Sequence, residues 1–478
     1  MLSYTRSHHL GRLQKLFAIY FKFRGITAKG FDTLHALALT MSHKWTCDAV
    51  GRISKEAMIE VIQLTDIYPW LLTYDNINIP FRVFSQRLDN QGEFGNGTAA
   101  TVYIKRSAVP LSESANRNLQ ETRTAGLKNP LTLLDVMDLA YKSFPIINSH
   151  MVYCVLRFLL DAPEFDFPTY ESNDSQALLP PPPIHQLPSG RDHITLQYLL
   201  GTVNIPEASY DDNSRLIKEW LHQLHLDAKD VQIKLGLEKV LAWVGDQLTV
   251  DRLRNLFKFR AEDANSFDRL DWMVPVFGWL HLMMAYASTL HKQYLGTSKG
   301  RGLSQAFDIT NKKGLGVASI KGPFHHDLNE ALYHVAEAHI REDWLILGKV
   351  DNLKELQKKT PEQLVALANT LVKTRASSKA IDELAVLPEE QQDQIFLRTV
   401  MWNRDVLQYI VLDQAVKHGD IGLMEEFLPH LLFRFLGGNN SKYANEILEL
   451  LQALHREWPE EVRCSFFIMA YTQSSLIF

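Results

Sequence analysis

The sequence predicts an α/β protein in which a mixed sheet is combined with many helices (an α/β or α+β fold). Runs rich in apolar, β-branched and aromatic residues predict strands at 70–79, 100–105, 240–244 and 272–277. Elsewhere apolar residues mostly recur at i, i+3 and i+4, the spacing of a helix with one buried face. Strand, helix and strand follow one another between residues 238 and 281, and we expect this stretch to form one α/β unit.

Length and composition bound the class of protein. With 478 residues, 46% of them hydrophobic and 22% charged, the chain has the composition of a globular protein larger than one typical domain. Three cysteines, Cys47, Cys154 and Cys464, lie far apart, which suits a reducing compartment. No apolar run reaches the length of a membrane span. We therefore expect a nuclear or cytoplasmic protein without a membrane partner.

The order of patterns predicts the organisation of the chain. A helical region precedes a core that holds the strands, among them a hairpin with a glycine-rich loop (Gly92, Gly95, Gly97) and a third strand at 195–205. A Pro-rich insertion with four consecutive prolines predicts a stiff polyproline II segment. The expected parts are 1–66 (helical), 67–295 (core, with the Pro-rich insertion 162–192), 296–322 (basic Gly/Lys loop), 323–441 (helical insertion) and 442–478 (last core helix).

Two local basic segments are candidates for contact with DNA, because the net charge of −5 excludes a globally basic surface. Residues 1–31 contain Arg6, Arg12, Lys15, Lys22, Arg24 and Lys29 and no acid. This segment is compatible with a solvated surface helix, a DNA-contacting arm or a mitochondrial presequence. Residues 292–321 form the second basic segment, which is either a phosphate-contacting loop or a solvated loop.

Two acids suggest metal chemistry. Asp75 lies within the first predicted strand, and Asp246 directly follows the strand 240–244. If these strands are neighbours, both carboxylates face one point, and a third acid from a helix would complete a site for two divalent ions. Mg²⁺ or Mn²⁺ is then the expected cofactor, because Mg²⁺ is held by a few carboxylates together with water.

Each of these residues also has a structural interpretation. Asp75 with Asn76 is compatible with a strand-end pair, and Asp246 with the N-cap of the following helix. His281 is compatible with a hydrogen-bonded core histidine. The sequence has no Walker A loop, no dinucleotide-binding glycine fingerprint, no HExxH and no GxSxG. Their absence disfavours kinases, oxidoreductases, serine hydrolases and metalloproteases.

Several segments resemble a large fungal family known only as a domain of unknown function, whose many copies per genome are typical of transposon-derived genes. These segments are TYDNINIPFRV (73–83), GTAATVYI (97–104), VGDQLTVDRLR (244–254), RLDWMVPVFGWLHLMMAY (269–286), HKQYLGT (291–297) and KYANEILELL (442–451). The resemblance extends from about residue 10 to about residue 465 and implies no established activity.

A looser resemblance concerns the Mutator- and hAT-like transposases. An Asp at a strand end, followed after about 35 residues by Pro and Trp-x-His, is similar to the second aspartate and the histidine of those enzymes. The resemblance implies a ribonuclease H-like core with a helical insertion before the last catalytic glutamate. By this analogy Asp75 and Asp246 are the two aspartates and His281 is the histidine. The third acid would be Glu446, with Glu449 as a fallback and Glu330 or Glu337 if the insertion is shorter.

Two features depart from that pattern. Gly278 occupies the position where the [C/D]xxH motif has Cys or Asp, and residues 469–478 resemble a truncated or frame-shifted end. We therefore expect a transposase-like protein with metal-dependent DNA strand cleavage and transfer by a DDE-type triad, whether active, inactive or domesticated. The alternative is a non-catalytic helical scaffold that binds protein or nucleic acid. Formation of a homo-oligomer is left open by the sequence.

Overall fold

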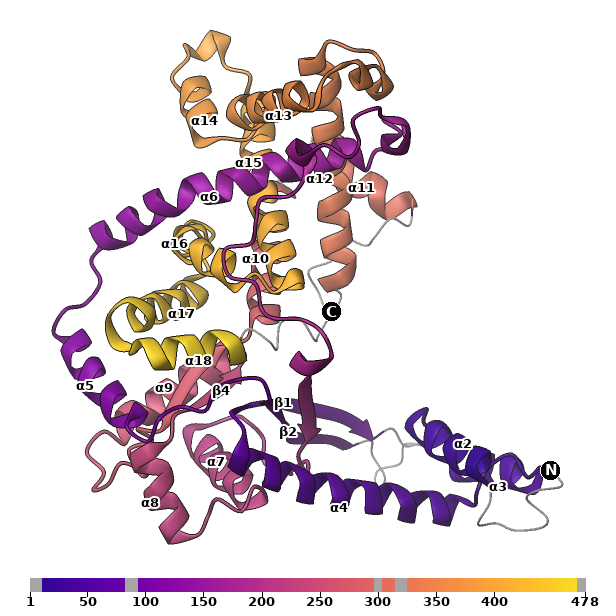
Figure 1. Cartoon of the computed structure of the whole chain (residues 1–478), viewed down its shortest axis with the longest axis vertical. Helices are drawn as coiled ribbons and strands as arrows, with labels where there is room; N and C mark the ends of the chain where they lie inside the picture. Colours follow the sequence, from indigo (N-terminus) through magenta and orange to yellow (C-terminus); the bar gives the residue numbers. More distant parts are fainter. Residues whose placement is uncertain (1–10, 82–92, 296–302, 314–324, 471–478) are drawn as a thin grey trace.

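A computed structural model describes residues 11–81, 93–295, 303–313 and 325–470 (Figure 1). Its centre is one five-stranded mixed sheet with the order β3-β2-β1-β4-β5. The strands are β1 (Trp70–Phe81), β2 (Glu93–Lys105), β3 (Thr195–Leu199), β4 (Leu241–Gly245) and β5 (Met273–Phe277). Neighbours among β1, β2 and β3 are antiparallel, whereas β4 runs parallel to both β1 and β5. The expected mixed sheet is therefore confirmed.

The sequences of the two parallel strands explain their places. Leu241, Ala242, Trp243 and Val244 are all buried, as expected for an inner parallel strand covered on both faces. β5 contains Pro275, which has no N–H to donate, and this strand lies at the edge of the sheet. Both strands follow the ranges predicted from their apolar runs to within one residue.

The β1–β2 hairpin is longer than the sequence predicted. The two strands pair from Trp70 with Ile104 to Phe81 with Glu93, so Gly95 and Gly97 belong to β2 rather than to a loop. A Cβ at Gly97 would lie 2.7 Å from the carbonyl oxygen of Val203. Glycine at this position therefore permits a close approach of backbone within the sheet. Gly92 lies outside the described residues.

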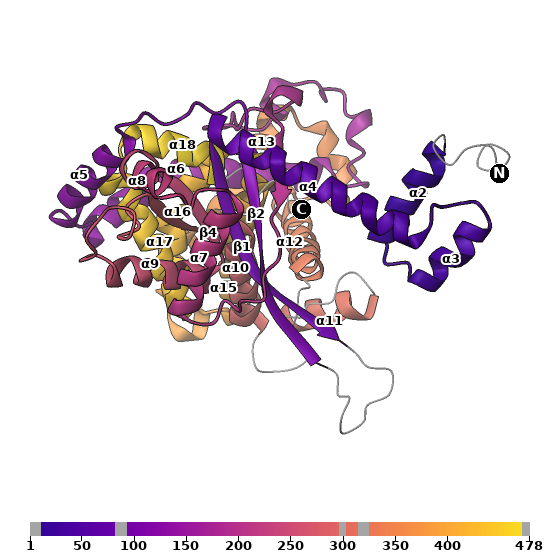
Figure 2. The same ribbon diagram turned by 90° about the horizontal axis from the view of Figure 1, so that it is seen from below.

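The N-terminal region is helical, as expected from residue 11 onward. It consists of α2 (Arg12–Phe23), α3 (Ala28–Ala36) and α4 (His43–Ile67). Ala18, Phe31 and Met41 form a small hydrophobic cluster separate from the main core. Figure 2 shows that α4 reaches the sheet at one end and carries α2 and α3 away from the rest of the protein at the other.

The connection between β2 and β3 contains one long helix where the spacing of apolar residues predicts two, at 131–140 and 147–160. Helix α5 (Ala115–Leu127) is followed by α6 (Leu133–Leu160), which continues through Pro145. Pro145 and Tyr141 are both exposed, so water can reach the Tyr141 carbonyl that lacks its helical donor. By length and composition α6 could cross a membrane, although no such span was expected; half of its most apolar window is buried inside the protein, as in a core helix.

Helices also connect the inner strands of the sheet. α7 (Tyr210–Gln223) and α8 (Lys229–Glu238) precede β4, α9 (Gln247–Phe259) joins β4 to β5, and α10 (Trp279–Leu295) follows β5. Residues 303–313 form helix α11, although a loop was expected over 296–322. The helix is explained by Phe307, which is buried against His291 and Trp402. Residues 296–302 and 314–324, the rest of that basic segment, lie outside the described structure.

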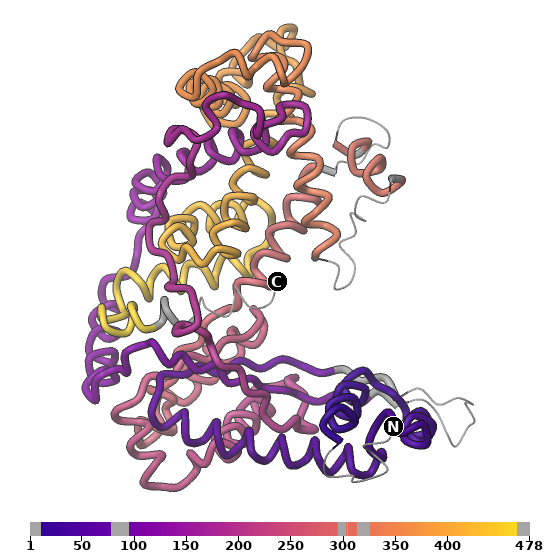
Figure 3. The backbone as a smooth tube through the Cα atoms, turned by 45° about the vertical axis from the view of Figure 1, so that its right-hand side comes forward, coloured from indigo at the N-terminus to yellow at the C-terminus, as the bar shows by residue number. Residues whose placement is uncertain are grey.

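The expected helical insertion is present and lies apart from the sheet (Figure 3). It comprises α12 (His325–Gly348), α13 (Pro361–Arg375), α14 (Ser378–Ala385), α15 (Gln394–His418) and α16 (Ile421–Gly437). Helix α6 packs against α12, α13, α15 and α16, so the β2–β3 connection contributes to this helical part. The chain returns through α17 (Ser441–Gln452), a π-helical turn (Ala453–Glu457) and α18 (Glu460–Ala470). The boundaries expected for the separate parts stay predictions, and residues 471–478 lie outside the description.

Candidate functional site

The two candidate aspartates lie on neighbouring strands at the carboxyl end of β4. The parallel register pairs Thr73 of β1 with Val244 of β4, and each aspartate lies two residues further along its strand direction. Asp75 and Asp246 both line one cavity of about 400 Å³. Their meeting at this edge agrees with the placement of ligands in open α/β sheets.

His281 reaches the same cavity from the next strand. The N–H of Gly278, at the end of β5, donates to the carbonyl of Gly245 at 2.9 Å. This bond holds the end of β5 beside the end of β4, and α10 begins one residue later at Trp279. His281 therefore stands in the first turn of α10 and lines the cavity with Asp75 and Asp246.

Opposing effects act on the pKa of Asp75. Although the side chain is exposed, partial desolvation raises the pKa of its carboxyl group, and Asp246 contributes to the rise. The backbone N–H of Asn76, which donates to Asp75 Oδ1 at 2.7 Å, and the nearby His281 both lower this pKa. Two carboxylates within electrostatic range of each other would be stabilised together by a cation.

Asp246 is also the N-cap of α9. Its Oδ1 accepts a hydrogen bond from the backbone N–H of Thr249 at 2.7 Å, which confirms the capping interpretation. Within the described residues, Oδ2 of Asp246 has no hydrogen-bond donor. The Asp246 carboxylate can thus cap α9 through Oδ1 while Oδ2 remains available to bind a ligand in the cavity.

Glu446, the expected third acid, is not at this cavity. Its two oxygens each accept a hydrogen bond from Arg254 at 2.8 Å, and only 2% of the residue is exposed. Both residues line a different cavity, on the side of β5, together with Glu449. The structure therefore does not bring Glu446 to the two aspartates: α17 packs against α9, and this packing directs the glutamate to an arginine of α9.

The other candidates for the third acid lie elsewhere too. Glu449 is 3.8 Å from Arg254, Glu330 is 3.1 Å from His326, and Glu337 is 2.5 Å from Arg341. Each of them is thus paired on a helix, and none lines the cavity of the two aspartates.

Glu207 is an acid that the sequence analysis missed. It lies between β3 and α7, is buried, and connects the segments that carry the two aspartates. Its Oε1 accepts from Thr249 Oγ1 at 2.6 Å, and its backbone N–H donates to Asn76 Oδ1 at 2.9 Å. Arg252 lies 3.4 Å from Oε1. No periodic pattern surrounds Glu207, so no sequence signal pointed to it.

Burial raises the pKa of Glu207 from 4.5 to about 7, and Asp246 and Asp75 contribute, whereas Thr249 and Arg252 lower it. Between pH 4.5 and about 7, the folded protein therefore keeps a proton on Glu207 that the unfolded protein has released. The contribution of this protonated carboxyl group to the stability of the fold is complete at low pH and is lost as pH rises from 4.5 to about 7. Relative to Glu207→Gln, we expect the free energy of unfolding of the wild type to fall by up to about 3 kcal/mol across this window. Urea unfolding of both proteins at several pH values would measure the difference, and parallel curves would contradict it.

The two carboxylates are the only groups at this cavity, among its described lining residues, that suit a hydrated divalent cation. Across the described ranges, no three His, Cys, Asp or Glu residues are grouped closely enough to hold a metal ion. Two carboxylates could still hold hydrated Mg²⁺ or Mn²⁺, because Mg²⁺ commonly uses one or two carboxylates and completes its shell with water and substrate phosphate. Asp75 and Asp246 are the residues that would hold it, and His281 lines the same cavity.

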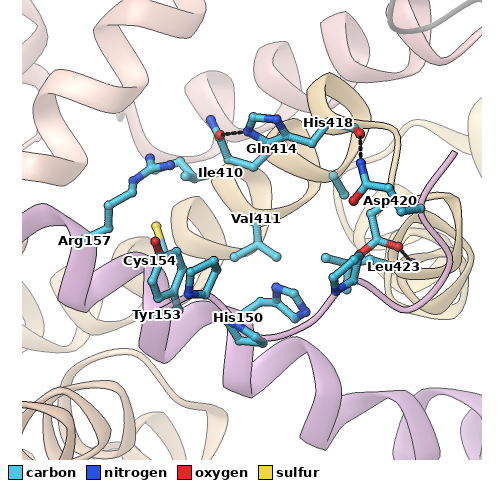
Figure 4. Close-up of a pocket in the computed structure, with 15 residues that line it drawn as sticks. His150, Tyr153, Cys154, Arg157, Ile410, Val411, Gln414, His418, Asp420 and Leu423 are labelled. Atoms are coloured by element: carbon cyan, nitrogen blue, oxygen red, sulfur yellow. Dashed lines mark hydrogen bonds between the residues drawn. The ribbon is translucent and has the colours of Figure 1, made fainter. Parts of the chain in front are cut away.

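A second cavity, of about 360 Å³, lies in the helical part between α6 and α15. Figure 4 shows Arg157 at one end and Asp420 at the other, with His150 and Val411 between them. The Pro-rich segment forms one wall through Pro180, Pro181 and Pro183. This part of the expected Pro-rich insertion is therefore packed against the helical part rather than separate from it.

Asp420 fastens the Pro-rich segment to the start of α16. Its carboxylate accepts from the backbone N–H of Ile184 at 3.2 Å, of His185 at 3.1 Å and of Leu423 at 3.2 Å. We expect Asp420→Ala to lower the free energy of unfolding by about 2–3 kcal/mol, because three backbone N–H groups lose their acceptor. Urea unfolding would measure this, and limited proteolysis should become faster near residues 180–187. Asp393→Ala, which removes a helix cap alone, should cost only about 1 kcal/mol; equal losses would contradict the fastening role.

Comparison with known proteins identifies a family. The sequence model of one protein family, described as a family of unknown function, matches residues 126–468. No curated protein and no solved structure matches the chain. The matched range contains Asp246 and His281, whereas Asp75 precedes it.

Proposed function

The chain belongs to the DUF6589 family, a family of unknown function. We propose that it is a transposase-like protein that cleaves and transfers DNA strands with a divalent metal ion. One observation carries the proposal. Asp75 and Asp246 each lie two residues after the paired residues Thr73 and Val244 of two parallel strands, and both line one cavity with His281. A pair of acids at that edge of a ribonuclease H-like sheet would suit metal-dependent phosphodiester chemistry.

The residues would have distinct roles. Asp75 and Asp246 would bind Mg²⁺ or Mn²⁺, and the bound ion would supply Lewis acidity toward a phosphodiester. His281 would orient the phosphate or a water molecule from the first turn of α10. Glu207 would hold Asn76 and Thr249 in place, and so fix the backbone beside both aspartates. Glu446 has no part in this mechanism, because Arg254 occupies both of its oxygens.

DNA would be the partner, and basic residues of the N-terminal region would contact its phosphates. Arg12, Arg24 and Lys29 are exposed on or beside α2 and α3, which α4 holds away from the sheet (Figure 2). Contacts of this type are independent of sequence and weaken as salt is added. The basic segment 292–321 is the second proposed contact, and a nuclear or cytoplasmic location and self-association remain parts of this proposal.

A non-catalytic scaffold is the rival proposal, and one observation favours it. The acid expected to complete the triad is neutralised by an arginine, which leaves two carboxylates at the cavity. A decayed or domesticated transposase that retained the fold without the chemistry would have this appearance.

Titration of Mn²⁺, followed by calorimetry, distinguishes the two proposals. A metal site predicts one carboxylate-dependent binding event that is lost in Asp75→Asn and in Asp246→Asn. Asp211→Asn, which changes an exposed acid in the first turn of α7, is the matched control and should bind Mn²⁺ as the wild type does. Equal binding in all four proteins, or no binding in any, would support the scaffold instead.

A further inference from the structure

A polar cavity in the helical part contains two arginines. It has a volume of about 340 Å³ and lies where four helices meet. Its lining residues come from α10 (Gln293), α14 (Ser378), α15 (Arg404, Gln408) and α16 (His430, Phe433, Arg434, Gly437). The proposed metal site shares none of these residues.

The two arginines share a single carboxylate. Arg434 makes two hydrogen bonds to Asp405, and Arg404 Nε donates to Asp405 Oδ1 at 2.8 Å. Asp405 is fully buried, and the side chains of Arg434 and Arg404 are only 13% and 21% exposed. Two guanidinium groups against one carboxylate leave one positive charge in a largely desolvated place, where an anion would be strongly favoured.

Among the described residues that line the cavity, no other group neutralises that charge. Burial lowers the pKa of His430 to about 4, so its imidazole is neutral at pH 7. Tyr294 donates its hydroxyl hydrogen to Asp405 and thus uses the same carboxylate. The remaining polar lining, Gln293, Gln408 and Ser378, carries no charge.

The hydrogen bonds of the Arg404 guanidinium group leave one of its nitrogens available to a ligand. Nε is used by Asp405, and Nη1 donates to Ser378 Oγ at 3.0 Å. Within the described part of the chain, Nη2 of Arg404 has no acceptor, and Arg404 lines the cavity. Ser378 is the first residue of the eight-residue helix α14, whose positive dipole end therefore adjoins the same space.

We propose that this cavity, named here the Arg404–Arg434 cavity, binds a phosphate group, either of a free phosphomonoester or of a nucleic-acid backbone. A planar guanidinium with unused donors matches the oxygens of a phosphate, and the amides of Gln293 and Gln408 supply further neutral donors. The site is independent of the proposed strand cleavage, because it uses no residue of the sheet.

The test measures the binding of inorganic phosphate to the full chain by calorimetry, with chloride at equal ionic strength as the reference. Phosphate should bind the wild type, and Arg404→Gln should weaken it by at least about tenfold, because a charge-assisted hydrogen bond is lost. Arg404→Lys should recover part of the affinity. Arg434 still pairs with Asp405 in these variants, so the fold should persist, as circular dichroism would check.

Arg398→Gln is the matched control. Arg398 is exposed on the same helix, outside the cavity, and its replacement removes the same charge. It should leave phosphate affinity unchanged, as should Asp246→Asn, which separates this proposal from the metal site. Absence of phosphate binding by the wild type, or equal weakening by Arg404→Gln and Arg398→Gln, would overturn the proposal.

A second arm identifies the source of the phosphate. A fluorescently labelled DNA duplex is titrated in the presence and absence of inorganic phosphate. If the backbone of DNA is the ligand, Arg404→Gln weakens duplex binding more than Arg398→Gln does, and phosphate competes. If duplex affinity is the same in both variants while phosphate binding still depends on Arg404, the ligand is a free phosphomonoester.

Discussion

Asp246→Asn should reduce Mg²⁺- or Mn²⁺-dependent nicking of a DNA duplex by at least about 1000-fold. Asparagine is nearly isosteric and is itself a good N-cap, so it can keep the hydrogen bond from Thr249 that starts α9. The change therefore removes the negative charge that would hold the metal ion while it preserves the local fold. The measurement is the conversion of supercoiled to open-circular plasmid over time.

The matched control is another capping aspartate. Asp393 accepts hydrogen bonds from the N–H groups of Ile395 and Phe396 at the start of α15, far from the sheet in sequence. Asp393→Asn should nick at the wild-type rate. Nicking that persists in Asp246→Asn would show that this carboxylate is no metal ligand and that any nuclease activity arises elsewhere.

The sequence predicted those parts of the site that depend on strand direction. Strands 240–244 and 272–277 were recognisable as short apolar runs, and parallel strands end at the same edge of a sheet. For this reason Asp75 and Asp246 were expected to meet if their strands were neighbours, whereas His281 was added by the resemblance to transposases. The expected two-strand neighbourhood of Asp75 and Asp246 is present in the structure.

The pairing of charged side chains between helices that are far apart in the chain could not be predicted from the sequence. Arg254 and Glu446 are 192 positions apart and meet only because α9 and α17 pack together. Helical periodicity shows which face of each helix is buried, but it does not show which buried charge meets which partner. Glu207 was missed for a related reason, because a buried acid in an irregular connection has no periodicity that would identify it.

Exposed backbone explains the difference at α6. The spacing of apolar residues predicted two helices, at 131–140 and 147–160, and the gap between them contains Pro145, a residue type that usually ends a helix. In the structure Pro145 lies on the solvent side, and the helix continues because its buried face packs against α13 and α16. Tertiary packing thus overrode the local signal.

Arg254→Met should lower the free energy of unfolding by about 3–5 kcal/mol, the usual cost of leaving a buried charge without its partner. The side chain of Arg254 is only 18% exposed and makes both hydrogen bonds to the buried carboxylate of Glu446. Burial already raises the pKa of Glu446, and Arg254 opposes this rise. Removal of the arginine would therefore leave the glutamate either charged in an apolar place or protonated. Urea unfolding at pH 7 measures the loss.

The double variant Arg254→Met with Glu446→Leu distinguishes a structural pair from a metal ligand. Because both charges disappear together, it should regain most of the stability lost in Arg254→Met. If Glu446 only stabilises the packing of α9 on α17, the double variant should also bind Mn²⁺ as the wild type does. Loss of Mn²⁺ binding in a stably folded double variant would show that Glu446 is a metal ligand after all. Helix α17 would then have to move toward Asp246, and Tyr443 of this helix is already close enough to interact electrostatically with Asp246.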